Sequence, residues 1–220
     1  MQAVVSTNVG SSTASCLTVA RWTSTTGAYF TRITGRGGFR WASSPPSYAA
    51  RRQIDTNLFG PLWVTQAALP VLRGQGSGHI IQVSSVGGVF ALPGLGLYHA
   101  SKWGLEGMTS SLAMEVRPFG VKVTLVEPAG FATDWQGASA DQAEHSPAYA
   151  EFRANLPVSA SARRGDPDAT AAAILAIADA DEPPLRVFLG DQPLPLMRAE
   201  YARRITEWEA WDDLSGKAFG

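Results

Sequence analysis

The sequence predicts an α/β fold in which helices cover an open parallel sheet. From about residue 48 onward, strand-type and helix-type segments alternate along the chain. The strand-type segments are continuously apolar, as expected for strands that are buried on both faces of a parallel sheet. The 220 residues are 45% hydrophobic, which is enough to fill the core of a single α/β domain.

The expected elements follow one another in a regular order. A helical run over 48–73 is closed by Gly74, and a second helix is expected over 98–117. Asp166 and Pro167 are typical of the N-cap and the first position of a third helix. A polar helix containing several aromatic residues is expected over 198–211. Strands are expected over 79–85, 121–128 and 185–190.

Composition excludes several classes of function. The net charge of −1 provides no strong field for nucleic acid or an anionic membrane. The single cysteine, Cys16, excludes an intramolecular disulfide framework and fits a reducing compartment. The three histidines lack metal-ligand spacing, and no apolar run is long enough to cross a membrane. We therefore expect a cytoplasmic protein with no metal, no nucleic-acid partner and no membrane partner.

The N-terminal segment differs from the rest of the chain. Six of the 18 basic residues and none of the 19 acids lie in residues 1–54, so this segment carries +6 and the remainder −7. Serine and threonine dominate residues 1–47, and the weak periodicity predicts loop or weak strand. We therefore divide the chain into an atypical segment, 1–47, and a core of alternating strands and helices, 48–220, within a single domain overall.

Tyr98 and Lys102 form the first candidate site. Their i, i+4 spacing places both side chains on one face of the expected helix. That helix follows a strand ending in Ser84 and Ser85, and ligands bind at the carboxyl ends of strands in open parallel sheets. The next residue, His99, is expected on the helix surface and not as a ligand.

These residue types suit proton transfer to an alcohol or a carbonyl. A free phenol has a pKa near 10, and a neighbouring ammonium lowers that value. Tyr98 could therefore exchange a proton with a substrate oxygen near neutral pH, while Ser85 holds that oxygen by a hydrogen bond. The alternative is an exposed helical pair that contributes a few tenths of a kcal/mol to stability.

Asn57 is a further candidate because of the proline that follows it. Pro61 cannot donate a backbone hydrogen bond to the carbonyl four residues earlier, and its ring crowds that carbonyl. A kinked helix could therefore direct the free Asn57 carbonyl at a water molecule. The alternative is that Asn57 merely caps or kinks the helix.

Together these motifs resemble the short-chain dehydrogenase/reductase family from about residue 48 onward. The family signature is Tyr-x-x-x-Lys with a serine 13 residues earlier, which is Ser85, and an asparagine about 40 residues earlier, which is Asn57. The family's Pro-Gly-x-x-x-Thr has its counterpart in PAGFAT, residues 128–133, with Ala129 replacing the first glycine. The resemblance implies a Rossmann-like doubly wound parallel sheet. It also implies an NAD(P)-dependent oxidoreductase that interconverts a carbonyl and an alcohol by hydride transfer.

The resemblance also implies a role for each matching residue. Tyr98 would be the acid/base, Ser85 would orient the substrate oxygen, Lys102 would tune Tyr98, and Asn57 would hold a relay water. The residues implied to bind the cofactor are Tyr98, Lys102, Pro128, Phe131 and Thr133. Helices 48–73 and 98–117 would pair across subunits in a homodimer or homotetramer. The substrate, and the choice between NAD and NADP, are not encoded in these motifs.

The family's glycine-rich phosphate turn, Thr-Gly-x-x-x-Gly-x-Gly, has no match in the sequence. VVSTNVGSST contains a single glycine, and the glycines of TGRGGF have the wrong spacing. Only 56 residues precede Asn57, too few for the strand-helix units that the family places there. We therefore expect the fold to be incomplete in its N-terminal, adenine-binding half.

Three explanations of this N-terminal segment stay open. It could be a targeting peptide, a divergent cofactor half, or an incomplete or out-of-frame sequence; the abrupt loss of acids and periodicity favours the last. Two hypotheses about function follow. The chain is either an NAD(P)-dependent oxidoreductase or a non-catalytic, dimerising remnant that has lost its phosphate-binding motif.

Overall fold

A computed structural model describes residues 15–21, 28–34, 47–133, 147–155 and 164–220, and the statements below concern these residues. The first candidate phosphate turn, within residues 4–13, lies outside them. So do all but the first residue of the second candidate, 34–39, and most of the segment between residues 134 and 163.

The centre of the fold is an open sheet with strand order β2-β1-β3-β4-β5. Strands β3 (Gly78–Val83), β4 (Val121–Pro128) and β5 (Arg186–Leu189) are parallel neighbours. The prediction of three adjacent parallel strands is therefore confirmed. Strand β3 ends two residues earlier than expected, because Ser84 and Ser85 begin a loop, and β5 is one residue shorter than expected at each end.

Two antiparallel strands extend the sheet on the β3 side. Strands β1 (Ser15–Arg21) and β2 (Ala28–Thr34) pair with each other over their full lengths, and β1 pairs antiparallel with β3. The sequence predicted only loop or weak strand in this segment. The complete sheet is consequently mixed, with a parallel half and an antiparallel half.

The helices lie close to their expected positions. The first helical run consists of α1 (Ser47–Ile54), a π-helical turn η1 (Asp55–Phe59) and α2 (Gly60–Gln75). The remaining helices are α3 (Gly96–Val116), α4 (Ala150–Ala154), α5 (Thr170–Asp179), α6 (Pro193–Glu209) and α7 (Asp212–Phe219). The Asp166 side chain accepts a hydrogen bond from the Asp168 N–H, which confirms it as an N-cap.

One expected helix end was wrong. The helix does not close at Gly74 but continues to Gln75, and Gly76 forms the C-cap with φ 65°. A left-handed residue at this position lets the Gly76 N–H bond the Arg73 carbonyl, and glycine adopts that conformation without steric cost.

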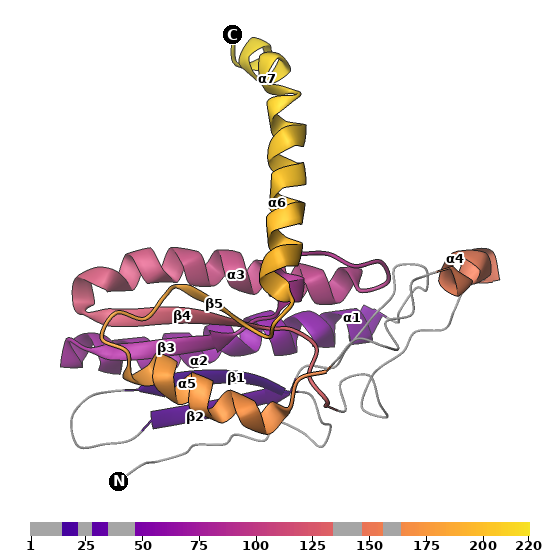
Figure 1. Cartoon of the computed structure of the whole chain (residues 1–220). Coiled ribbons are helices and arrows are strands. Elements are labelled where there is room, and N and C mark those ends of the chain that lie inside the picture. Colours follow the sequence, from indigo (N-terminus) through magenta and orange to yellow (C-terminus); the bar gives the residue numbers. More distant parts are fainter. Residues whose placement is uncertain (1–14, 22–27, 35–46, 134–146, 156–163) are drawn as a thin grey trace.

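Helices cover both faces of the parallel half of the sheet (Figure 1). On one face, α2 and α3 bury a core composed of Leu72, Ile80, Leu112, Val116, Val121 and Val123. On the other face, Ile177 of α5 packs against Ile81 and Val126. Ile80 and Ile81 are consecutive in β3 and point to opposite faces, as the strand pleat requires. The expectation that both long helices share one face is confirmed.

Helix α6 projects away from the sheet and carries α7 at its tip (Figure 1). It begins just after β5, and its buried residues, Pro193 and Met197, lie in its first turns. Trp208 near its end and Trp211, the N-cap of α7, are exposed. In the described part of the chain, no helix is long and apolar enough to cross a membrane.

Candidate active site

The loop after β3 brings Ser85 and Tyr98 to the same place. Ser85 caps a short 3-10 turn, Val86–Gly88, and its Oγ accepts a hydrogen bond of 3.0 Å from the Gly87 N–H. The Tyr98 ring lies directly against Gly87, because a Cβ at Gly87 would come within 2.9 Å of Tyr98 Cε1. Glycine thus allows the turn that carries Ser85 to pack against the tyrosine.

Lys102 extends its side chain inward to the carboxyl end of β3. Its side chain is buried, and its Nζ donates a hydrogen bond of 2.9 Å to the carbonyl of Val83, the last residue of the strand. An ammonium has three N–H donors. Among the described residues this bond uses one of them, which leaves two for a ligand or water.

Asn57 lies within the π-helical turn and is completely buried. Its Nδ2 donates to Ser101 Oγ at 3.0 Å, and that hydroxyl donates to the Tyr98 carbonyl at 2.7 Å. Asn57 therefore connects to the first turns of α3. Its Oδ1 is buried without a hydrogen-bond partner among the described residues. A helix irregularity was expected here, and π-helical turns are frequent at functional sites; the relay water stays a prediction.

The implied nicotinamide segment begins where β4 ends. Pro128 is the last residue of β4, and the Ala129 N–H donates to the Leu189 carbonyl. Phe131 pairs with Gly165 in an isolated bridge, and its ring packs against that glycine. Thr133 is exposed at the end of this segment. These residues follow the strand next to β3, so they lie at the same edge of the sheet as Ser85; their contact with a cofactor stays a prediction.

His99 is not a surface residue, and that expectation was wrong. It is 7% exposed, and both ring nitrogens hold the loop after β3. Nδ1 lies 2.7 Å from the Gly87 carbonyl, and Nε2 accepts a 2.8 Å bond from the Leu92 N–H. Because the carbonyl can only accept, Nδ1 carries the proton. A histidine at this position was expected at the surface because its ring is polar. The available signal was the loop after β3, whose backbone N–H and C=O groups need hydrogen-bond partners.

Sequence reasoning also missed a buried acidic pair behind the Ser85 loop. Glu106 of α3 and Glu127 of β4 are almost fully buried, and both lie beside Arg186 of β5. The pKa of Glu127 is raised to about 7, mainly by burial and also by the neighbouring Glu106 carboxylate, while Arg186 opposes the shift. A charged residue within the apolar run VKVTLVEP was the available signal. The described residues contain no group of three side chains suited to hold a metal ion.

The phosphate-binding half of the expected cofactor site cannot be placed on the described residues. The connections from β1 to β2 and from β2 to α1 lie outside them. The predicted absence of a glycine-rich turn therefore stays a prediction. The structure does describe Ser85, Tyr98 and Lys102, whose roles in a reaction stay a prediction.

Comparisons of this sequence with known proteins point to a single family. A family profile described as short chain dehydrogenase matches residues 35–144. Oxidoreductase BOA17 of Botryotinia fuckeliana is 38% identical over 172 residues, which cover 74% of this chain and 61% of that protein. The 3-ketodihydrosphingosine reductase of Bacteroides thetaiotaomicron is 35% identical over 156 residues, 69% of this chain and 56% of that protein.

Solved structures agree with the sequence comparisons. A short-chain dehydrogenase from Streptomyces avermitilis has a TM-score of 0.72 and 34% identity, and the match covers 83% of this chain and 67% of that one. A short chain dehydrogenase from Burkholderia cenocepacia, solved in complex with NADP, has a TM-score of 0.57. At 22% identity, covering 79% of this chain and 65% of that one, it supports the fold alone.

This chain spans 61%, 53% and 56% of three curated relatives. The family profile nevertheless matches half of the chain, and the Streptomyces structure shares its fold over most of its length. By sequence motif, sheet topology and structural likeness, the chain belongs to the short-chain dehydrogenase family.

Proposed function

We propose that this chain carries the catalytic centre of an NAD(P)-dependent oxidoreductase that interconverts a carbonyl and an alcohol. The placement of Lys102 supports this proposal most strongly. A buried ammonium lies at the carboxyl end of β3, one helical turn from Tyr98, and Tyr98 packs against the turn that carries Ser85. A buried lysine is costly unless its charge has a use.

Each hydroxyl has a distinct task in the proposed reaction. Tyr98 gives its phenolic proton to the substrate oxygen during reduction and takes one back during oxidation. Ser85 Oγ uses one lone pair for the Gly87 N–H, which leaves its own O–H to donate to the same substrate oxygen. That bond holds the oxygen in place and stabilises the negative charge that develops on it.

The donors near Tyr98 fit the nicotinamide end of a dinucleotide. The two remaining Lys102 N–H donors suit ribose hydroxyls, and the segment containing Pro128, Phe131 and Thr133 would hold the carboxamide. When bound, the nicotinamide supplies or accepts the hydride. The Burkholderia relative was solved with NADP, and a 4-hydroxyisoleucine dehydrogenase of similar fold was solved with NADH. These neighbours support a nicotinamide dinucleotide without choosing between the two forms.

Asn57 would complete the path by which Tyr98 regains its proton. Its unpaired, buried Oδ1 requires a donor, and an ordered water is the usual solution for such a group. A water bonded there would lie near the first turns of α3, to which Asn57 is already joined through Ser101. In the proposal, this water passes protons onward to Lys102.

Calorimetric titration of the chain with NADPH and NADH tests the proposal. Cofactor binding that weakens at least tenfold in Lys102→Met supports the oxidoreductase, even where the wild-type dissociation constant is about millimolar because the phosphate-binding turn is missing. Glu115→Gln, an exposed substitution on the same helix, should bind like the wild type. Absence of binding up to about 10 mM cofactor would instead support a dimerising remnant without catalysis.

We also propose that the chain forms a homo-oligomer through α1, α2 and α3. Trp63 on α2 and Met114 on α3 are 59% and 72% exposed, and Phe59 stacks on Trp63 at the surface. Large exposed apolar side chains on long helices are typical of subunit interfaces. Light scattering should show a mass of at least a dimer, which Trp63→Lys should reduce; a monomeric wild type would contradict the proposal.

A further inference from the structure

A cavity of about 660 Å³ lies between α3, β4, β5 and α6. Glu106 and Glu127 line it together with Arg186, and Trp103, Phe188 and Met197 form its apolar wall. Glu106 follows Tyr98 by eight residues, which is about 12 Å along an α-helix. Glu106 therefore lies farther along α3 than Tyr98, while Gly88 and Val89 of the loop after β3 line the same cavity.

The two carboxylates in this cavity are not fully satisfied. Arg186 Nε donates to Glu106 Oε2 at 3.1 Å and lies 3.5 Å from Glu127 Oε1. Glu106 Oε1 and Glu127 Oε1 are buried without hydrogen-bond partners among the described residues. The Ser84 hydroxyl is also buried, with no hydrogen-bond partner in the part of the chain that the structure describes, and both it and Glu106 Oε1 lie close to Gly88 in the cavity lining. Buried carboxylate oxygens without donors are costly, so this site favours a ligand that brings donors.

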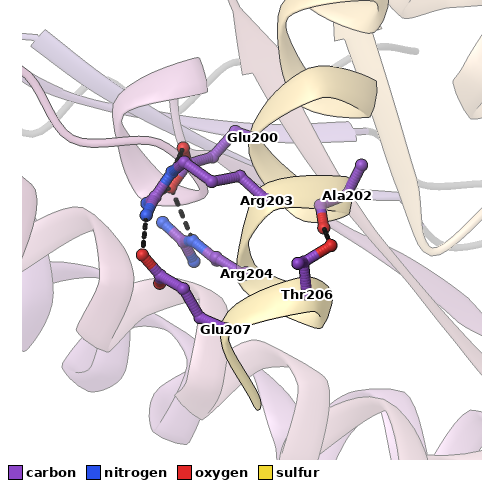
Figure 2. A network of polar contacts seen from close by, with 6 residues as sticks. All are labelled: Glu200, Ala202, Arg203, Arg204, Thr206 and Glu207. Carbon is purple, nitrogen blue, oxygen red and sulfur yellow. Dashed lines mark hydrogen bonds and ion pairs between the residues drawn. The ribbon is translucent and has the colours of Figure 1, made fainter. Parts of the chain in front are cut away.

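Among the described residues, the cavity is lined by two acidic side chains and only one basic side chain. When both glutamates are ionised, Arg186 compensates only one of them, and its NH2 group also donates to Ser110. Arg204 of α6 lies over the Trp103 ring at 4.7 Å. Its charge is already paired with Glu200, as Figure 2 shows.

The Glu200 network stays ionised over the ordinary pH range. Hydrogen bonds from Arg203 and then from Arg204 lower the pKa of Glu200 to about 2. Arg203 also pairs with Glu207 on the next turn (Figure 2). The α6 wall of the cavity therefore has its charges paired and does not supply the missing positive charge.

We propose that this cavity binds a small organic ammonium. Its N–H groups would donate to Glu106 Oε1 and Glu127 Oε1, and its apolar part would lie against Trp103, Phe188 and Met197. An ammonium has three donors, enough for both oxygens. It also supplies the one positive charge that the carboxylate pair and Arg186 leave uncompensated.

Binding of such a ligand is linked to a proton on Glu127. The groups facing Glu127 are Glu106 from α3, Arg186 from β5 and, across the cavity, Tyr201 from α6. With the cavity free, Glu127 keeps its proton up to about pH 7. An ammonium would replace that proton, so its affinity increases as the pH rises through 7.

Calorimetric titration of the full chain with hexylammonium tests this inference. We expect binding about tenfold tighter at pH 8 than at pH 6, because one proton must leave Glu127 at the lower pH. 1-Hexanol, with the same apolar chain, should bind at least tenfold more weakly, and hexanoate should not bind. Glu127→Gln should weaken hexylammonium binding at least tenfold and remove its pH dependence, whereas the exposed substitution Glu182→Gln should change neither.

Two results would overturn the inference. Equal binding of hexylammonium and 1-hexanol would show an apolar cavity without ammonium recognition, and no binding up to about 10 mM would exclude the site. If Glu127→Gln does not fold, the pH series and the matched ligands on the wild type decide the question. None of these measurements uses a nicotinamide cofactor, so their outcome is independent of the proposed oxidoreductase function.

Discussion

Individual side chains hold the loop that follows β3. Lys102 bonds the Val83 carbonyl on one side of Ser85, and His99 bonds Gly87 and Leu92 on the other. Both side chains come from the same two turns of α3, so the helix holds the loop at three backbone positions. This arrangement fixes the position of Ser85 relative to Tyr98.

Gly87→Ala tests the contact between this loop and Tyr98. The added Cβ would lie 2.9 Å from Tyr98 Cε1 and 3.1 Å from His99 Nδ1, so both rings must move. We expect the free energy of unfolding in urea to fall by about 1–3 kcal/mol. As a control, an added Cβ at Gly107, on the α3 helix that carries both rings, meets nothing within 4 Å. Gly107→Ala should therefore raise the free energy of unfolding by about 0.5–1 kcal/mol. Equal stability of Gly87→Ala and the wild type would show that the rings do not contact the loop in this way.

Glu127 should make stability depend on pH. Its pKa rises from 4.5 to about 7 on folding, so between these values the folded state holds a proton that the unfolded state has lost. The group's contribution to stability is therefore present below pH 4.5 and decreases as the pH rises to 7, by up to about 3 kcal/mol. Urea unfolding at pH 5, 6, 7 and 8 measures it. Glu127→Gln should flatten the slope, and an unchanged slope in this variant would contradict the assignment.

At the scale of elements, the hydrophobic periodicity of the sequence predicted which helices and strands are present. The residue at which each one ends depends on local backbone conformation. The parallel strands and the α2 and α3 helices were predictable because their apolar positions recur regularly over many residues. The end of α2 was not, because two glycines compete there and only Gly76 adopts the left-handed conformation. Pro61 indicated where the first helical run would be irregular, but not that the irregularity is a π-helical turn.

The turns that precede β3 and β4 are packed against each other through Gly120. This residue has φ 70°, and an added Cβ would lie 2.3 Å from the Gly76 carbonyl oxygen. We expect Gly120→Ala to lower the free energy of unfolding by at least about 2 kcal/mol. Gly74→Ala, two residues before Gly76 and with nothing within 4 Å, should raise it by about 0.5–1 kcal/mol. Thermal unfolding of both variants gives the comparison, and a stable Gly120→Ala protein would contradict the described turn.

At the scale of the molecule, the two sites differed in how far the sequence predicted them. Ser85, Tyr98 and Lys102 lie within 18 residues on one strand-loop-helix unit, so their spacing alone placed them together. Glu106, Glu127 and Arg186 come from α3, β4 and β5, and Glu106 and Arg186 are 80 residues apart. Only the packing of three elements reveals that they meet.

The N-terminal segment bears on how tightly the proposed reaction site could bind its cofactor. The resemblance places pyrophosphate on a glycine-rich turn whose motif has no match in the sequence. If that lost interaction amounts to roughly 4 kcal/mol, cofactor affinity falls about a thousandfold. Tyr98, Lys102 and the segment after Pro128 would then hold the cofactor alone. We therefore predict weak cofactor binding by this chain and strong binding once a phosphate-binding half is supplied.

The most direct measurement is carbonyl reduction by a chimera in which a strand-turn-helix cofactor half, with the glycine-rich turn, replaces residues 1–47. We predict NADPH- or NADH-dependent reduction by the chimera and at least about a hundredfold lower kcat in its Tyr98→Phe variant, with cofactor binding nearly unchanged. This substitution removes the proton but leaves the pocket. A Tyr98→Phe chimera that reduces carbonyls as fast as its parent would contradict the assignment of Tyr98 as the proton donor.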